Sequence, residues 1–268
     1  MTQAQLLVQP LAPQHDPPTL VDTHVHLDDR VFDQDRDEVV ARSRQTHVGI
    51  VLMSTDLNNA ERVIALAKRH GLTCAIGVHP NTATTADDTL ESTLKERAQE
   101  GEVVALGEIG LDYYRDNSPR ALQHAVLRRQ LALALTLDLP VVLHNRQATD
   151  DLLSIVKEFR GLKGVFHSFM GDTQEADAIL ELGFFLGLGG SLTFKKNEPL
   201  RQTVRQLPLS SLLLETDSPY LTPVPLRGRR NEPAYVRHVA NTLAQIRDDS
   251  IEHVASQTSA NARRLFGR

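Results

Sequence analysis

The sequence has no tryptophan, one cysteine and only 4% aromatic residues in 268 positions. Because Cys74 has no possible partner within the chain, an internal disulfide is excluded, which is typical of a reducing compartment. No apolar run approaches the roughly 20 residues that a membrane helix needs. The first 20 residues contain neither Lys nor Arg, so they lack the basic segment of a secretory signal. We therefore expect a cytoplasmic protein without a membrane partner.

The N-terminus differs in composition from the rest of the chain. It carries four prolines within its first 20 residues, and we predict a flexible proline-rich tail over residues 1–18. The remaining chain, 19–268, shows no linker or low-complexity block and is predicted to form one domain. The net charge of −5 provides no overall basic field, so a nucleic-acid substrate would have to be held locally by metal ions and a few arginines.

Short apolar runs alternate with stretches of helical periodicity. The eight runs are residues 20–27, 48–54, 73–79, 103–111, 140–145, 164–169, 184–190 and 211–217. Strands that alternate with helices imply parallel strands joined by crossovers. Eight such units in about 250 residues predict an α/β fold, a closed (β/α)8 TIM barrel in a single domain, ending in one or two helices over residues 233–265.

An open, doubly wound sheet is the alternative arrangement of such units. That fold often carries a glycine-rich phosphate loop after its first strand. Here the first strand is followed by "LDDR", which contains no glycine. The sequence therefore favours the barrel.

Polar residues with metal-binding side chains stand late in five of the predicted strands. They are His24, His26, Glu108, His144, His167 and Asp217. The C-terminal ends of barrel strands form the active-site face, and strand side chains alternate with period 2. With these six pointing inward, Leu106, Val142, Val165 and Leu213 are predicted to lie inside the barrel beneath them. Asp22 and Glu215 share this face deeper down, where we expect them to orient the ligands.

A single H-x-H pair or a lone histidine at a strand end is a weak signal, because most such histidines are structural. Four imidazoles and two carboxylates at one barrel mouth, however, are too costly to gather without a compensating charge. One or two divalent metal ions supply it. Imidazole with carboxylate suits zinc, manganese, iron or nickel better than calcium, and a bridging carboxylate favours a pair of ions.

Several motifs resemble those of the TatD family of metal-dependent hydrolases, within the amidohydrolase superfamily. In order they are "DTHVHLD", "GVHP", "GEIGLDYY", "LPVVLHNR", "GVFHSFMG", "ETDSPYLTP", "RGRRNEP" and "NARRLF", and they span the chain from about residue 20 to 266. The resemblance implies that His24 and His26 hold one ion together with Asp217, and that His144 and His167 hold a second. It implies that Glu108 bridges both ions and that Asp217 takes a proton from the attacking water.

The resemblance also implies an activity. It points to a deoxyribonuclease that acts on single-stranded DNA from the 3′ end, in which a metal-bound hydroxide attacks phosphorus. We expect zinc, manganese or magnesium as cofactor, single-stranded nucleic acid as substrate, a role in DNA repair, and no obligate protein partner.

The substrate contacts are predicted from position. Arg146 follows His144 by two residues and Arg227 lies in the loop after the last strand, where barrels often bind phosphate. His79 ends the third strand and could contact the phosphate or donate a proton, or it could be a turn histidine. Tyr113 could stack on a base or pack beneath its loop. Lys195, Lys196 and Arg230 are expected to be solvated surface charges.

Two other functions remain open. The same ligands would serve hydrolysis of an ester or amide, such as deacylation of a D-aminoacyl-tRNA, because a metal hydroxide attacks a carbonyl carbon equally well. A non-catalytic barrel is the second, but an inert scaffold need not carry such a costly polar cluster. The arginines discriminate between the classes, since a phosphodiester needs more than one phosphate-binding group.

Overall fold

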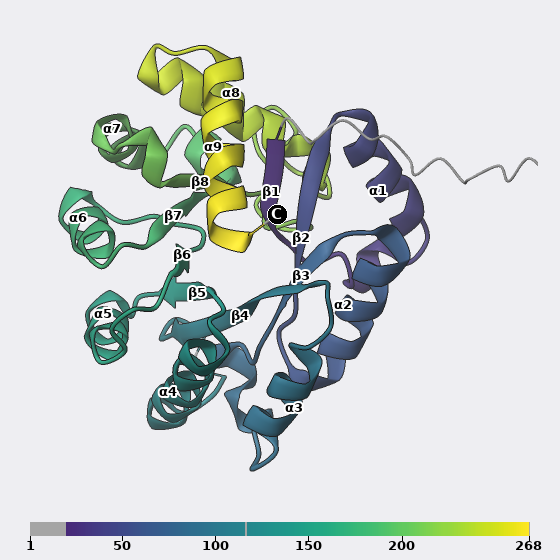
Figure 1. Cartoon of the computed structure of the whole chain (residues 1–268). Coiled ribbons are helices and arrows are strands. Elements are labelled where there is room, and N and C mark those ends of the chain that lie inside the picture. Colours follow the sequence, from purple (N-terminus) through teal and green to yellow (C-terminus); the bar gives the residue numbers. More distant parts are fainter. Residues whose placement is uncertain (1–19, 116, 268) are drawn as a thin grey trace, which may run out of the picture.

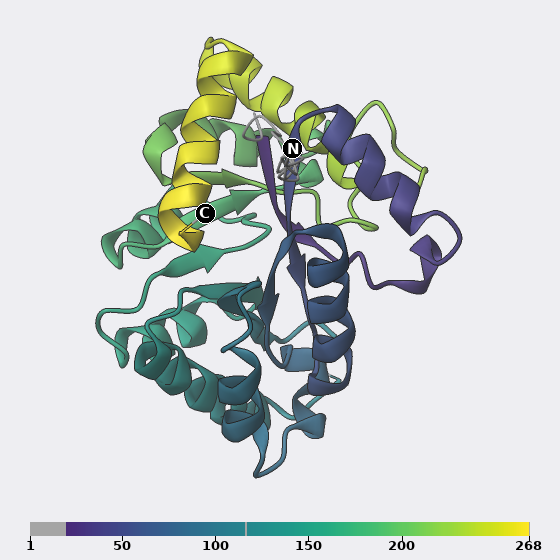
Figure 2. The same cartoon turned by 45° about the vertical axis from the view of Figure 1, so that its right-hand side comes forward.

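The protein is described by a computed structural model that covers residues 20–115 and 117–267, so the predicted tail lies outside the described residues. Eight parallel strands form one sheet in the order of the sequence, and helices surround them (Figures 1 and 2). The strands are β1 (Leu20–Val25), β2 (Val48–Met53), β3 (Thr73–Ile76), β4 (Val103–Asp112), β5 (Val141–Arg146), β6 (Gly164–Phe166), β7 (Phe185–Leu188) and β8 (Leu212–Leu214). The predicted (β/α)8 barrel is confirmed.

The helices follow the strands in alternation. They are α1 (Arg36–Gln45), α2 (Leu57–His70), α3 (Leu90–Arg97), α4 (Arg120–Leu137), α5 (Thr149–Lys157), α6 (Thr173–Glu181), α7 (Glu198–Gln206), α8 (Val236–Arg247) and α9 (Ile251–Phe266). The two last helices confirm the predicted C-terminal pair. None of the described helices is long and apolar enough to cross a bilayer.

The barrel closes between β1 and the segment that follows β8. Asp217 donates its backbone N–H to the carbonyl of His24 at 3.0 Å, and His26 donates to the carbonyl of Ser218 at 2.9 Å. Within the barrel, the Thr23 hydroxyl donates to the carbonyl of Leu214 at 3.0 Å. Closure therefore places Asp217 directly beside the two histidines of β1.

The barrel interior holds an apolar cluster that includes Val142, Val165 and Leu213, as the alternation predicted. Its N-terminal end is covered by α9, which adds Ala262, Leu265 and Phe266 to that cluster. The Asn261 amide fixes this helix by donating to the carbonyls of Leu209 and Leu212. The apolar floor beneath the polar residues is thus completed by a helix from outside the sheet.

The prediction for Leu106 was wrong. Leu106 packs in the other cluster, between the sheet and its helices, while Ala105 faces the interior. The register between β4 and β5 shifts between Leu106 and Ile109, which interrupts the simple alternation there. Glu108 still reaches the mouth, but it does so because of this irregularity.

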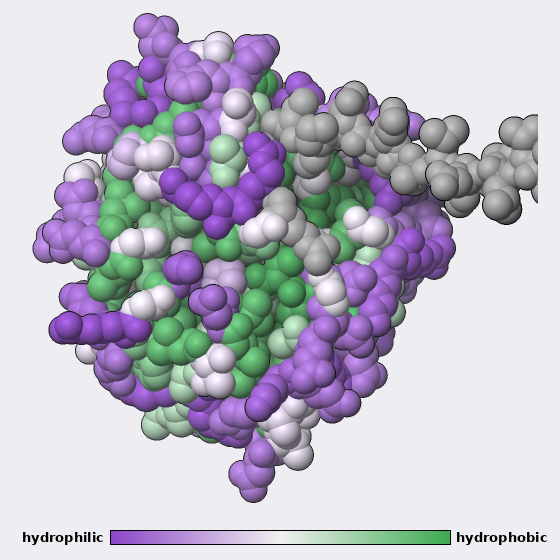
Figure 3. All heavy atoms as spheres, in the orientation of Figure 1, coloured by the Kyte–Doolittle hydropathy of each residue, from purple (hydrophilic) through white to green (hydrophobic). Residues whose placement is uncertain are grey.

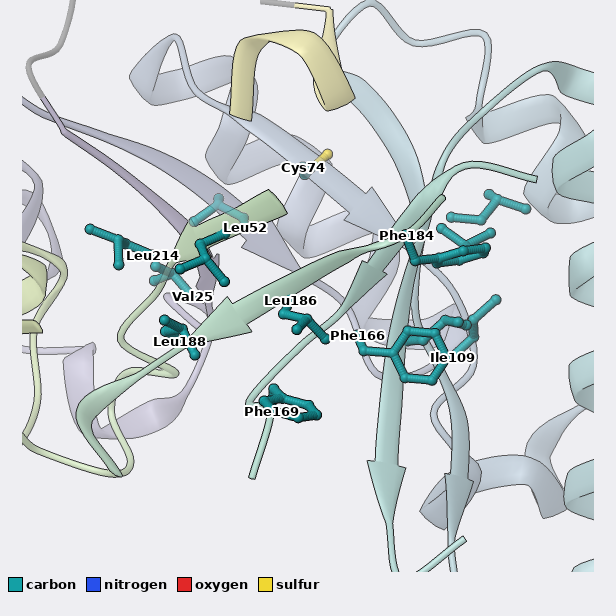
Figure 4. Packing of buried hydrophobic residues seen from close by; sticks show 14 of the residues in the cluster. Val25, Leu52, Cys74, Ile109, Phe166, Phe169, Phe184, Leu186, Leu188 and Leu214 are labelled. Carbon is teal, nitrogen blue, oxygen red and sulfur yellow. The ribbon is translucent and has the colours of Figure 1, made fainter. Parts of the chain in front are cut away.

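The outer core lies between the strands and the surrounding helices. Figure 4 shows its packing, in which Phe166 and Phe184 meet edge to face with ring centroids 5.6 Å apart. Helix α2 shows how local sequence sets the helix bounds. The carboxylate of Asp56 caps its first turn, and Gly71 ends it in the left-handed conformation at φ 57°. Hydrophilic residues cover the peripheral helices in the space-filling view of Figure 3.

Candidate metal centre

A cavity of about 880 Å³ opens at the C-terminal ends of the strands, and His26, Glu108, His144, His167 and Asp217 line it. His24 lies just beneath, fully buried. The six residues predicted from five strand ends are therefore gathered at one place. They divide into two groups that meet at Glu108.

The first group comes from β1 and the segment after β8. The Nε2 atoms of His24 and His26 are 3.2 Å apart, and both face Glu108 Oε2, at 3.3 and 3.6 Å. Asp217 Oδ1 lies 3.8 Å from His24 Nε2 and 3.4 Å from His26 Nε2. Four donor atoms thus converge from two imidazoles and two carboxylates.

The second group comes from β5 and the residue that follows β6. His144 Nδ1 and His167 Nε2 are 3.2 Å apart, and they lie 2.7 and 2.8 Å from Glu108 Oε1. The rings of His24 and His167 stack at 3.9 Å between centroids, so the two groups are direct neighbours. Each oxygen of Glu108 therefore serves a different group.

These separations suit metal coordination. Donor atoms bound to one ion at about 2.1 Å lie roughly 3.0–3.4 Å from one another. Three distances in the first group fall in that range, and so does the distance between His144 and His167 in the second. Imidazole nitrogen and carboxylate oxygen are also the donors that zinc and similar ions select. The residues present fit a divalent ion in each group.

The buried carboxylates and imidazoles of the cluster shift one another's pKa. Burial alone would raise the pKa of Glu108, but the charges of His167, His79 and His24 lower it well below its usual range. Burial likewise opposes protonation of His167, yet Glu108 and Glu215 raise its pKa well above the usual value. Protonation of His167 is thus favoured by the neighbouring carboxylates, and a metal ion bound by its ring would displace that proton.

Asp22 and Glu215, which were predicted to orient the ligands, are both buried beside the six clustered residues. Asp22 is fully buried and accepts from the backbone amides of His24 and Thr216, at 3.3 and 2.8 Å, and from the Thr216 hydroxyl. Asp22 therefore joins β1 to the residue before Asp217 through the main chain, and it does not contact an imidazole.

Glu215 acts on the second group. Its Oε1 accepts from the backbone amide of Ser168 at 2.6 Å and lies 3.5 Å from His167 Nδ1. A Cβ at Gly187 would meet Glu215 Oε2 at 2.3 Å, so only glycine leaves room for this carboxylate. The position of His167 thus depends on a glycine of the neighbouring strand.

Sequence reasoning missed Asp112. This carboxylate ends β4, is 1% exposed, and lies 3.3 Å from His144 Nε2. It also accepts from the Asn81 amide and from the backbone amides of Tyr114 and Arg115. Although burial would raise its pKa, these hydrogen bonds and His144 lower it. Its spacing of four residues from Glu108, on the same strand, is the signal that could have identified it.

His79 lies beside the second group, with Nε2 3.4 Å from Glu108 Oε1. Its Nδ1 accepts from the backbone amide of Asn81 at 3.0 Å. A neutral imidazole whose Nδ1 accepts carries its proton on Nε2. Burial lowers the pKa of His79 and so favours this neutral form. His79 therefore presents an N–H donor to the cavity.

The predicted substrate contacts are only partly brought together. Arg146 lines the cavity, with its guanidinium 4.2 Å from the centroid of the exposed Tyr114 ring. Arg227 is not among the described lining residues. It stacks at 4.0 Å on Phe194, which is one of them. Lys196, expected to be a solvated charge, does line the cavity, and so does Arg115, which was not predicted.

Tyr113 does not reach the cavity. Its hydroxyl bonds to Asp151 and His124, and Arg120 covers its ring at 4.0 Å. The ring packs against the outer core, as in the alternative considered for it. Tyr114, whose exposed fraction is 59%, is the aromatic side chain that this turn presents to solvent. The predicted contact of Tyr113 with a base is therefore not supported, because its ring faces the outer core.

Arg230 proves to be structural. It bonds to Asp35 Oδ2 at 2.7 Å and to Glu232 Oε1 at 2.9 Å, and Arg42 joins the same carboxylates. This network ties the loop after β8 to α1. The Asn231 amide also donates to the carbonyls of Thr216 and Tyr220, which holds that loop against the backbone around Asp217.

The chain matches the family model described as TatD related DNase over residues 21–267. It is 39% identical over 251 residues to YabD of Bacillus subtilis, an uncharacterized metal-dependent hydrolase, with 92% of this chain and 98% of that protein covered. It is 36% identical over 257 residues to a 3′-5′ ssDNA/RNA exonuclease TatD of Erwinia tasmaniensis, with 92% and 99% covered.

A solved structure agrees with these relatives. The crystal structure of YJJV, a TatD homologue from Escherichia coli K12, is 33% identical and superposes with a TM-score of 0.88, covering 93% of this chain and 98% of that one. The matches extend over the barrel and over every residue of the candidate metal centre. This protein therefore belongs to the TatD family and is a metal-dependent hydrolase.

Proposed function

We propose that the protein is a nuclease that removes nucleotides from the 3′ end of single-stranded DNA by hydrolysing phosphodiester bonds. The observation that carries this proposal is the position of Glu108, whose two oxygens face two separate donor groups at the base of the cavity. Such a carboxylate suits a pair of ions, the arrangement common to many nucleases and phosphatases. The relative named a 3′-5′ ssDNA/RNA exonuclease supports the choice of substrate and direction.

One divalent ion would be held by His24, His26, Asp217 and Glu108. The other would be held by His144, His167 and Glu108. Ions bound there supply Lewis acidity toward phosphoryl oxygens and make water a stronger acid. The protein fixes the two groups relative to each other through one side chain. A fixed distance between the two groups would hold a reacting phosphodiester in one orientation between them.

Asp217 would accept the proton of the attacking water. It lines the cavity, and its side chain is 15% exposed compared with 4% for Glu108. Burial would raise its pKa, but the hydrogen bond from His26 and the charge of His24 lower it, so the carboxylate is ionised at neutral pH. Proton acceptance by a positioned carboxylate typically contributes about 10²–10⁴-fold to a rate.

The cavity rim supplies the groups that hold the phosphate. The rim is lined by Arg115, Arg146 and Lys196. Inside the cavity, the Nε2–H of His79 would donate to a phosphate oxygen. These cations support a phosphodiester over a D-aminoacyl ester, because the latter has one neutral carbonyl at the reacting centre and needs fewer of them. Cytoplasmic location and a role in DNA repair stay predictions.

The proposal is tested with metal-reconstituted protein and single-stranded DNA labelled at its 5′ end. We expect progressive shortening from the 3′ end, abolished in the His24→Ala, Asp217→Ala variant. Cleavage that persists in that variant would mean a contaminating nuclease. The same protein is given a D-aminoacyl-tRNA in parallel, and deacylation without DNA cleavage would replace the nuclease by the alternative function.

The rim is tested separately. Replacing Arg115 and Arg146 by Ala should weaken DNA cleavage at least tenfold while metal content stays intact, since each charged contact to phosphate contributes about 1–3 kcal/mol. The matched control is the Arg160→Ala, Lys163→Ala variant, which removes two exposed cations from the loop before β6, at the other end of the barrel. Equal cleavage by both double variants would refute the phosphate role of the rim.

A further inference from the structure

A second cavity, of about 620 Å³, is lined by residues of α7, α8 and the loops beside them. The two helices pack against each other on the outside of the barrel (Figure 1). Helix α8 turns His238, Asn241, Thr242 and Gln245 toward this groove, at the i, i+3, i+4, i+7 spacing of one helical face. The side chains of this face are polar and can form hydrogen bonds. The face is uncharged, because burial lowers the pKa of His238.

The opposite wall of the groove is cationic. Lys195 and Arg205 line it, both are exposed, and neither forms an ion pair among the residues that the structure describes. Arg201 and Glu198 neutralise each other at 2.8 Å, and Arg201 also donates to backbone carbonyls. The groove therefore keeps two uncompensated positive charges on a chain whose net charge is −5.

The groove shares a wall with the cavity of the metal centre. Thr193 and Lys195 line the groove, whereas Phe194 and Lys196 line the metal cavity. Phe194 has extended backbone, φ −76° and ψ 132°, in which successive side chains point to opposite sides. One strip of backbone, residues 193–196, thus separates the two cavities and presents a lysine to each.

Arg227 lies between the metal cavity and the groove. Its guanidinium stacks on Phe194 at 4.0 Å, and its loop also contributes Val224 to the groove. An exposed arginine on an aromatic ring offers both a charge for phosphate and a flat surface for a base. A row of cationic side chains therefore leads from the metal cavity into the groove. It consists of Lys196, Arg227, Lys195 and Arg205.

We propose that the groove between α7 and α8 is a second binding site, which holds the sugar–phosphate backbone of the single strand several nucleotides to the 5′ side of the cleaved bond. This rests on the proposed nuclease function. Lys195 and Arg205 bind phosphates, and the amides of Asn241 and Gln245 bind polar groups of sugars or bases. The site improves the binding of long strands and leaves the chemistry at the metal centre unchanged.

The test compares a long strand with a dinucleotide in the Lys195→Ala, Arg205→Ala variant. For the long strand we expect KM to rise about tenfold with kcat unchanged. The slope of log KM against log salt should fall by about 1.4, which corresponds to two phosphate contacts on a single strand. KM and kcat for the dinucleotide should equal those of the unchanged protein. The Arg160→Ala, Lys163→Ala variant is the charge-matched control and should behave like the unchanged protein.

Equilibrium binding of the labelled long strand, followed by fluorescence anisotropy, separates this proposal from the nuclease itself. A protein that binds the strand but cleaves neither substrate refutes the nuclease. A Lys195→Ala, Arg205→Ala variant with unchanged affinity and salt slope refutes the groove. An equal loss for the dinucleotide and the long strand also refutes it, because the effect would then lie at the metal centre.

Discussion

The two ends of the barrel differ in what closes them. At the N-terminal end, α9 adds Leu265 and Phe266 to the apolar side chains inside the sheet. At the C-terminal end, imidazoles and carboxylates on the same strands face a cavity of about 880 Å³. The exclusion of water at the N-terminal end stabilises the fold. The buried polar groups at the C-terminal end cost part of that free energy of folding unless a cation compensates their charge. We therefore expect that stability and chemistry can be changed separately.

The largest effect is expected at the mouth. Replacing Asp217 by Asn removes the proposed proton acceptor and a carboxylate of the first group, so kcat for the proposed phosphodiester hydrolysis should fall by about 10²–10⁴-fold. The free energy of unfolding of the metal-free protein should stay within about 1 kcal/mol of its original value. Rate assays and urea unfolding measure the two quantities. A kcat within tenfold of the original would remove Asp217 from the mechanism.

At the N-terminal end of the barrel, a substitution should lower the stability and leave the activity unchanged. Replacing Phe266 by Ala opens a cavity beneath the barrel and should lower the free energy of unfolding by about 3 kcal/mol. Metal content and kcat of the folded protein should not change. Leu135→Ala on α4 is the control, since this side chain is 39% exposed and its loss should cost little. Loss of the metal centre in folded Phe266→Ala protein would show that the two ends are coupled.

A smaller effect is expected where Asp112 holds His144. Asp112→Asn keeps the shape of the side chain but removes the charge that faces His144 Nε2. We expect metal affinity to fall about 10–100-fold, the usual consequence of losing a carboxylate that orients a histidine ligand. Competition with a metal-binding dye measures this, and an unchanged affinity would reduce Asp112 to a structural residue.

The smallest effect concerns the charges outside the mouth. Arg230 lowers the pKa of Asp35 to about 2, compared with about 3.9 in an unfolded chain. A depressed pKa stabilises the folded state above about pH 4, and this contribution is lost as the pH falls toward 2. Because the two side chains are 28% and 33% exposed, solvent screens the pair and the effect is below about 1 kcal/mol.

Asp35→Asn tests this by urea unfolding. The variant should be less stable than the unchanged protein at pH 7, and the difference should disappear near pH 2. A difference that persists at pH 2 would show that Asp35 stabilises the fold by other means than its charge.

The sequence predicted most of the site because its signal is local. His24, His144 and His167 each end an apolar run, and parallel strands bring such ends together. The sequence does not show where regular alternation stops. Leu106 faces outward because the register of β4 shifts. Asp217 has a left-handed backbone, φ 58°, outside β8, and its place beside His24 depends on hydrogen bonds between the two segments.

Substrate contacts were harder to predict, because loops after strand ends follow no period. Tyr113 and Tyr114 are adjacent in sequence, and only the packing of α4 and α5 around the former decides which ring is exposed. Arg227 and Arg230 lie three residues apart, yet one stacks on Phe194 and the other pairs with Asp35. Composition and spacing alone cannot separate such neighbours.

We propose that Glu108 joins two metal ions. The most direct test is the number of divalent ions bound per chain, measured by elemental analysis after reconstitution and dialysis, in the unchanged protein and in Glu108→Gln. We predict two ions per chain in the former and at most one in the variant, with DNA cleavage lost. Two ions retained in Glu108→Gln, or full cleavage with one, would contradict the account.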